Sequence, residues 1–99
     1  MNLLITGTVL TQKDEPIEGM PITVYRKSEK IAQVTSQRNG QYTIMVQKGA
    51  PLALKFGNVH WPPSIIDGLS GQHNHEINKI MLSHAEVPQD VTNLSGESW

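Results

Sequence analysis

The sequence predicts an all-β fold, a two-layer sandwich of short antiparallel strands. Apolar residues recur at every second position in six segments, as expected for strands with one face on a core and the other in solvent. Glycine, proline or Asn-Gly interrupts the chain at strand-length intervals, and no stretch has the apolar spacing of an amphipathic helix. Six short strands separated by turns are typical of a sandwich or a barrel.

Three strands are expected in the N-terminal part of the chain, over residues 3–11, 20–27 and 31–36. In the second of these, Thr23 and Tyr25 should point outward, because side chains alternate between the two faces of a strand. The residues expected to face the core in the first two strands are Leu3, Ile5, Gly7, Val9, Ile22 and Val24. Because Gly7 has no side chain, we expect a neighbouring backbone or bulky group to approach the strand there.

The strongest local signal is Asn39-Gly40, which precedes an alternating segment over residues 41–46. Asn-Gly suits the positive φ angles of a type I′ turn, so we expect a hairpin here. Two more strands are expected over 52–56 and 76–82, with a long loop at 57–75 between them. The side chains expected to face the core in this half are Tyr42, Ile44, Val46, Leu52, Leu54, Phe56, Ile80 and Leu82.

The first expected strand has no charged residue between Leu3 and Leu10. Lysine or an inward-pointing charge usually protects an exposed strand edge from pairing with other chains. We therefore expect this strand to be covered by the C-terminal tail or by another subunit.

The length of 99 residues corresponds to one domain with a modest core. We expect a β-sandwich domain at 1–82 and an acidic tail at 83–99, mobile or docked on a partner. The tail contains Glu86, Asp90 and Glu97 but no lysine or arginine, so its charge is −3 and that of the remainder is +2.

Composition excludes several classes of partner. The net charge is −1, charged residues make up 17%, and no basic run is interleaved with aromatic residues, which argues against nucleic acid and anionic membranes. The absence of cysteine fits a reducing compartment. The apolar N-terminal run ends at Thr6-Gly7, too early for a signal peptide or a membrane span. We expect a soluble, cytoplasmic protein, or a secreted one if the chain is an excised domain.

A series of short motifs occurs in order through residues 3–82. These are Ile5-Thr6-Gly7-Thr8-Val9, Glu15-Pro16-Ile17-Glu18-Gly19, Ile22-Thr23-Val24, Val34-Thr35-Ser36, Asn39-Gly40-Gln41-Tyr42-Thr43-Ile44 and Ile80-Met81-Leu82. Their order and spacing resemble the carboxypeptidase regulatory-like domains of the transthyretin-like β-sandwich group. The resemblance implies a seven-strand, Greek-key-like antiparallel sandwich with a role in binding, folding support or assembly and no catalytic residue. The family usually has a short connection before the last strand, whereas this chain has the long 57–75 loop.

That loop contains the candidate binding residues His60, Trp61, His73 and His75. Trp61 beside Pro62-Pro63 is either a platform for a glycan or a protein partner, or a ring folded back to cap one end of the sandwich. A further tryptophan, Trp99, is either a linear motif for a partner or part of a disordered terminus.

His73 and His75 would lie on one face of an extended segment and could share a metal ion, with His60 as a third ligand. The spacing does not match a known metal signature, and histidine is common in polar loops. We therefore expect no bound metal and no cofactor, with His73 and His75 as weak candidates.

No motif in the sequence indicates an enzymatic function. A Ser-His-Asp set can be assembled only from Ser64 or Ser70, His73 and Asp67, all in one loop without visible support. The transthyretin-like 5-hydroxyisourate hydrolases use a Tyr-Arg-Gly-Ser ending and strand histidines, which this sequence does not show.

The sequence thus favours a non-catalytic module for protein binding or self-association. Recognition of a small ligand, a glycan or a metal, by the 57–75 loop is the alternative. Hydrolysis on a transthyretin-like fold is a third hypothesis.

Overall fold

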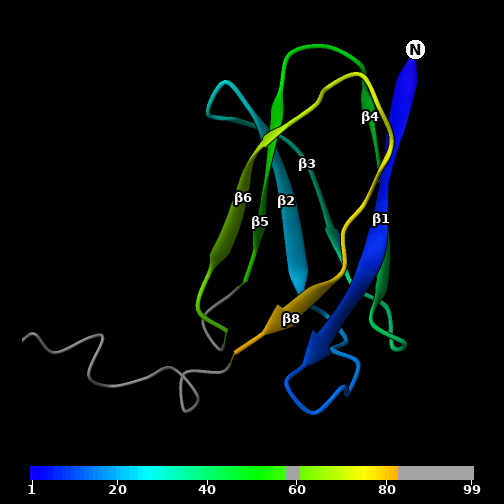
Figure 1. Ribbon diagram of the computed structural model, residues 1–99, viewed down its shortest axis with the longest axis vertical. Coiled ribbons are helices and arrows are strands. Elements are labelled where there is room, and N and C mark those ends of the chain that lie inside the picture. The colour runs from blue at the N-terminus through cyan, green and yellow to red at the C-terminus, as the bar shows by residue number, and fades with distance from the viewer. Residues whose placement is uncertain (58–60, 83–99) are drawn as a thin grey trace, which may run out of the picture.

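In the computed structural model, which describes residues 1–57 and 61–82, two β-sheets pack face to face (Figure 1). One sheet has the order β4–β1–β7, with β8 also paired to β1, and the other has the order β3–β2–β5–β6. The strand bounds are β1 Asn2–Thr11, β2 Pro21–Arg26, β3 Glu29–Thr35, β4 Gln41–Gln47, β5 Leu52–Phe56, β6 Ser64–Leu69, β7 His75–Glu76 and β8 Lys79–Met81. The predicted all-β sandwich is confirmed.

The core lies between the two sheets and is built by alternating side chains. In β4, Tyr42, Ile44 and Val46 are buried while the residues between them are exposed, as the sequence predicts. The Tyr42 ring meets the Phe56 ring of the opposite sheet edge to face, with 5.8 Å between ring centroids and 77° between ring planes. This aromatic pair joins the sheets at the centre of the core.

Outward-facing Thr23 is an exception to the predicted exposure, because only 8% of its surface is accessible. It lies on the central strand β2, with Gln33 of β3 and Lys55 of β5 as its neighbours in register. A short side chain between two long ones loses most of its access to water.

The predicted hairpin at Asn39-Gly40 is wrong. β3 pairs with β2 and β4 pairs with β1, so residues 36–40 cross from one sheet to the other. Gly40 has a φ of 82° and donates its amide N–H to the Gln37 carbonyl at 2.8 Å, whereas Asn39 stays outside the left-handed region. The pair terminates a tight turn, but tertiary packing decides which sheet the next strand joins.

A type I′ hairpin turn occurs instead between β2 and β3. Lys27 and Ser28 have φ values of 52° and 66°, and the flanking residues Arg26 and Glu29 are paired in register. Neither residue is the glycine or asparagine that this geometry favours, so the sequence carried no signal for it.

β1 is a central strand and not an edge. β4 pairs with it on one side, and β7 and β8 pair with it in parallel on the other. The expectation that the tail or another subunit covers it is therefore wrong. Two strands of the same domain cover it, which explains why β1 needs no charge.

The segment between β7 and β8 lies directly against β1 at Gly7. A Cβ atom at Gly7 would collide with the Ile77 carbonyl group and would come within 2.9 Å of the Tyr42 hydroxyl. Tyr42 donates its hydroxyl proton to the Ile77 carbonyl at 2.6 Å, and Ile77 donates its amide proton to Thr6 at 2.8 Å. Burial raises the pKa of the Tyr42 hydroxyl above its ordinary range. The close approach predicted for Gly7 is confirmed.

Two asparagine side chains extend the hydrogen bonding of β1 on either side of the short β7 pairing. Leu4 donates its amide proton to Asn74 Oδ1 at 2.8 Å, and Thr8 donates to Asn78 Oδ1 at 3.0 Å. The single predicted strand at 76–82 is thereby split into β7 and β8. Met81 is buried and Ile80 is 55% exposed, so the predicted inward register of Ile80 is wrong by one residue.

The predicted loop at 57–75 contains a six-residue strand, β6, which forms the edge of the second sheet beside β5. Counting β7 and β8 as one interrupted strand, the described residues give the seven strands that the family resemblance implied. Residues 83–99, the predicted tail, lie outside the described residues.

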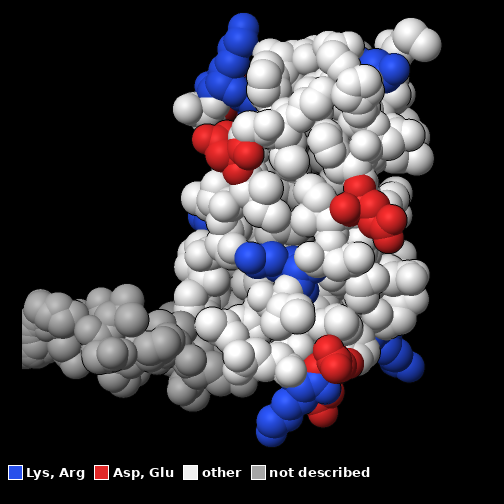
Figure 2. Space-filling view, in the orientation of Figure 1, with Lys and Arg blue, Asp and Glu red and all other residues white. Residues whose placement is uncertain are grey.

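Charged residues are scattered over the face shown in Figure 2, with wide uncharged areas between them. In the described part of the chain, no helix is long and apolar enough to cross a membrane.

Candidate binding site

The structure separates the residues that the sequence grouped in one loop. Trp61 is half-buried and packs against the hydrophobic core, as in the capping alternative. His73 is exposed in the bend after β6, and His75 is the first residue of β7. His60 and Trp99 lie outside the described residues, so their predicted roles stay predictions.

His75 is engaged by the backbone of its own loop. Its Nε2 lies 2.8 Å from the Ser70 carbonyl oxygen, and its neighbour in register is Ile5 of β1. Within residues 1–57 and 61–82, no three histidine, cysteine or acidic side chains are grouped closely enough to hold a metal ion. The geometry gives His75 a role in closing the loop.

The hypothetical Ser-His-Asp set is spread along β6. Ser64 begins the strand and Ser70 follows its end, and six residues of strand span about 20 Å. Ser70 Oγ accepts the Gln72 amide proton at 3.1 Å, and Asp67 Oδ1 accepts that of Gly68 at 2.8 Å. These two side chains are thus bonded to neighbouring backbone and not to His73 in the structure.

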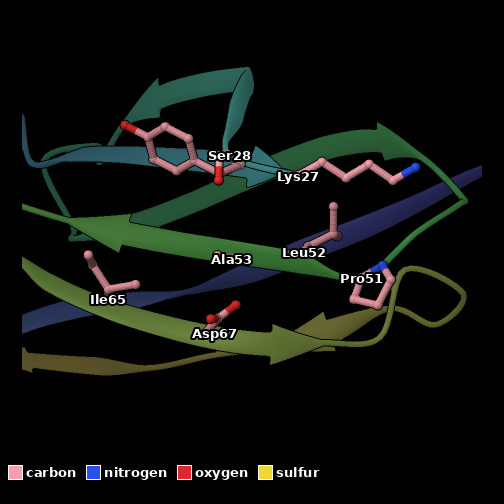
Figure 3. Close-up of a pocket in the computed structure, with 8 residues that line it drawn as sticks. Lys27, Ser28, Pro51, Leu52, Ala53, Ile65 and Asp67 are labelled. Carbon is pink, nitrogen blue, oxygen red and sulfur yellow. The ribbon is translucent and has the colours of Figure 1, made fainter.

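A groove of about 480 Å³ lies beside the β2–β3 turn (Figure 3). Tyr25 of β2 is in register with Ala53 of β5, and Ile65 of β6 is in register with Lys55, two residues along β5 from Ala53. These side chains therefore share one face of the sheet, because side chains alternate along a strand. The full lining is Tyr25, Lys27, Ser28, Pro51, Leu52, Ala53, Ile65 and Asp67.

The centre of the groove is apolar and its margin is charged. Ile65 is 65% exposed, so a large aliphatic side chain lies at the surface of the groove. Lys27 extends from the β2–β3 turn, and the Asp67 carboxylate rises from β6 (Figure 3). One cation and one anion therefore frame an apolar strip.

A network of main-chain contacts holds the Pro51 end of the groove. Arg26 donates from Nε to the Ala50 carbonyl at 3.0 Å and from Nη2 to the Gln47 carbonyl at 2.8 Å. Gly49 donates its amide proton to Gly71 at 2.8 Å, and a Cβ at Gly71 would collide with the 49–50 carbonyls. The turn before β5 and the loop after β6 are therefore locked together.

Sequence reasoning missed this groove because its third wall was assigned to a loop. Ser64–Leu69 contains the β-branched pair Ile65-Ile66, a strand signal, but Pro62-Pro63 before it and Gly68 within it indicated a loop. The outward orientation predicted for Tyr25 was the only feature predicted from the sequence that pointed to this face of the sheet.

The two sheets, the crossing from β3 to β4 and the strip of β7 and β8 along β1 define a transthyretin-like β-sandwich. The family model of the teneurin TTR-like domain matches residues 2–70, and the chain belongs to that family. This confirms the transthyretin-like group that the sequence motifs indicated. No curated protein sequence matches the chain.

Solved structures share the fold at low sequence identity. The 5-hydroxyisourate hydrolase of Klebsiella pneumoniae aligns with a TM-score of 0.64 and 13% identity, over 82% of this chain and 90% of that one. Hydroxyquinol 1,2-dioxygenase of Pseudomonas putida gives 0.62 and 9%, over 85% of this chain and 57% of that one. A streptococcal ancillary pilin gives 0.53 and 8%, over 84% and 33%. This chain therefore spans little more than half the dioxygenase, and these likenesses concern the fold alone.

Proposed function

We propose that this transthyretin-like domain is a non-catalytic module that binds protein through the groove on the outer face of β2, β5 and β6. The observation that carries the proposal is the exposure of Ile65 in a hollow that also contains Tyr25. Large apolar and aromatic side chains gathered on a surface are typical of contact sites.

The shape of the groove favours a protein over a small ligand. It is a partly open hollow on the face of the sheet, whereas small-molecule sites enclose most of the ligand surface. Lys27 and Asp67 at the margin would fix the orientation and speed the association of a partner more than they would strengthen binding.

The same geometry supports a role without catalysis. Asp67 and Ser70 are bonded to nearby backbone groups, and Ser64 is at the far end of β6. A nucleophile and its base need hydrogen-bond contact, which this arrangement does not provide.

Ile65→Lys tests the proposal, with Met45→Lys as a matched control. Met45 is 61% exposed on the outer face of the other sheet, so both variants replace a similarly exposed apolar residue by the same cation. Light scattering over a wide concentration range measures self-association. We expect Ile65→Lys to weaken association by at least about tenfold, the loss typical of a contact residue, and Met45→Lys to leave it unchanged. Equal effects of both variants would contradict the groove.

If the chain is monomeric at every concentration, self-assembly is excluded and a separate protein partner is tested. A photo-reactive residue placed at position 65, or at position 45 as the control, reports what contacts each face in the source cell. Reproducible capture of one protein from position 65 alone supports the proposal. Capture from both positions equally, or from position 45 alone, contradicts it.

A further inference from the structure

The chain contains two dipeptides in which glycine follows asparagine or aspartate, the arrangement that closes a succinimide most readily: Asn39-Gly40 and Asp67-Gly68. In each, the glycine nitrogen can attack the side-chain Cγ of the preceding residue and close a five-membered ring. Glycine permits this because it has no Cβ to hinder the approach. By sequence alone Asn39 is the more reactive, because ammonia leaves an amide more readily than water leaves a carboxylate near neutral pH.

At Asp67 the two reacting groups, the side-chain carboxyl and the Gly68 nitrogen, are close to each other and belong to exposed residues. The Gly68 amide donates to Asp67 Oδ1 at 2.8 Å, which holds the Gly68 nitrogen beside the carboxyl group that it has to attack. Gly68 has a φ of 72°, and both residues are exposed. The register of β6 against β5 shifts at this point, between Leu52 and Leu54, and Asp67 and Gly68 have no ladder partner among the described residues. Their pairing with β5 is therefore irregular.

At Asn39 each reacting group is engaged elsewhere. Gly40 donates its amide proton to the Gln37 carbonyl at 2.8 Å and is buried. The Asn39 carboxamide accepts the Gln41 amide proton at 3.0 Å and donates to Gln41 Oε1 at 3.0 Å. Gly40 is also closely packed, since a Cβ there would lie 2.7 Å from the Val9 carbonyl oxygen. Attack at this site requires the turn to open.

We propose that Asp67 is a site of spontaneous isoaspartate formation in the folded protein and that the fold protects Asn39. The Gly68 nitrogen forms a bond to Asp67 Cγ, the Cγ–OH bond of the neutral carboxylic acid breaks, and one water leaves with the former amide proton. Water then adds to either carbonyl of the ring. Opening at Cγ restores aspartate, and opening at the backbone carbonyl leaves isoaspartate, so no other reactant is required.

The product would alter the edge of the sheet. In isoaspartate the main chain passes through Cβ, which adds one carbon to β6 between Ile66 and Gly68 and leaves a carboxylate on the former Cα. The change falls at the margin of the groove.

The experiment compares the folded full-length chain with the same chain in denaturant, incubated in heavy-oxygen water near neutral pH. Peptide mapping by mass spectrometry reports isoaspartate at residue 67, which gains one heavy oxygen, and deamidation at residue 39. In denaturant we expect Asn39 to react first. In the folded chain we expect the order to reverse, with the Asn39 rate lowered by about tenfold or more because its reacting groups are held apart.

Asp67→Asn gives the matched comparison, because both sites are then Asn-Gly in one molecule. Deamidation should be at least about tenfold faster at position 67 than at position 39 when the chain is folded, and equal within a few-fold when it is unfolded. Asp67→Glu, which cannot close a five-membered ring, should abolish the signal at 67 and leave Asn39 unchanged. Faster reaction at Asn39 in the folded chain, or equal folded rates in Asp67→Asn, would overturn the proposal.

Discussion

Gly7 is the residue at which the backbone of β1 and the Ile77 carbonyl come into contact. We expect Gly7→Ala to lower the free energy of unfolding by about 3 kcal/mol, because the obstacle is backbone and cannot rotate away. Urea denaturation measures the loss. Gly19→Ala is the control, since Gly19 has a φ of 80° but nothing within 4 Å, so it should lose only about 1 kcal/mol from backbone strain. Equal losses would contradict the contact.

Tyr42 should make the free energy of unfolding depend on pH above about pH 10. Its pKa is raised by burial, so above about pH 10 an unfolded tyrosine loses its proton while the folded one keeps it. The unfolded state then binds fewer protons, and the free energy of unfolding falls as pH rises, by up to about 1.4 kcal/mol per pH unit. Below pH 10 this contribution is fully present.

Denaturation of the wild type and Tyr42→Phe at several pH values isolates the effect. The variant lacks the hydrogen bond to Ile77 and should be about 1 kcal/mol less stable at neutral pH. The difference between the two proteins should shrink above pH 10. A constant difference up to pH 11 would mean that Tyr42 ionises as readily in the folded state.

At the scale of single elements, the β2–β3 hairpin has a turn geometry that its two central residues do not favour. Both central residues, Lys27 and Ser28, are left-handed, which costs ordinary residues about 1 kcal/mol each. The double variant Lys27→Asn/Ser28→Gly should raise the free energy of unfolding by about 1–2 kcal/mol, because both replacements tolerate positive φ. Thermal or urea unfolding measures the gain.

Lys13→Gly is the matched control for the hairpin. Lys13 also lies in a turn, but its φ is not positive, so glycine there adds freedom to the unfolded chain and relieves no strain. Stability should fall slightly. A gain of similar size at both turns would show that the effect does not come from left-handed geometry.

β6 and the β7–β8 strip show why some elements escaped prediction. Ser64–Leu69 is short, contains Gly68 and follows two prolines, so its own residues indicate a loop, and it becomes a strand by pairing with β5. Asn74 falls in the predicted 57–75 loop, and Asn78 falls in the predicted strand at 76–82. In the fold their side chains replace main-chain partners of β1.

For the whole molecule, the sandwich is shared with proteins of unrelated activity. The 13% identity to the 5-hydroxyisourate hydrolase of Klebsiella pneumoniae concerns the scaffold, and function depends on the site placed on it. We expect this chain to leave 5-hydroxyisourate decaying at its spontaneous rate, as followed by ultraviolet absorbance, with the Klebsiella enzyme as the positive control. Saturable turnover that a Tyr42→Phe or a His75→Ala variant abolished would refute the proposal of a non-catalytic module.

The sequence by itself determined the all-β class, the inward faces of β1, β2, β4 and β5, the close approach at Gly7 and the transthyretin-like group. The fold class, the inward faces and the close approach follow from local alternation and from the missing side chain of Gly7, which each segment carries in its own residues. The transthyretin-like group was indicated by the order and spacing of the motifs, which resemble that group.

Only the tertiary structure decided which strands are neighbours. It placed β1 at the centre of a sheet, sent the chain across the sandwich at Asn39-Gly40, turned Met81 inward in place of Ile80, and made β6 the third wall of the groove. In the structure, His75 lies beside the Ser70 carbonyl oxygen and Trp61 packs against the core. The two residues therefore do not form the shared site that their place in one predicted loop suggested. Pairing between strands distant in sequence depends on long-range hydrogen bonds and shared burial, which no local pattern specifies.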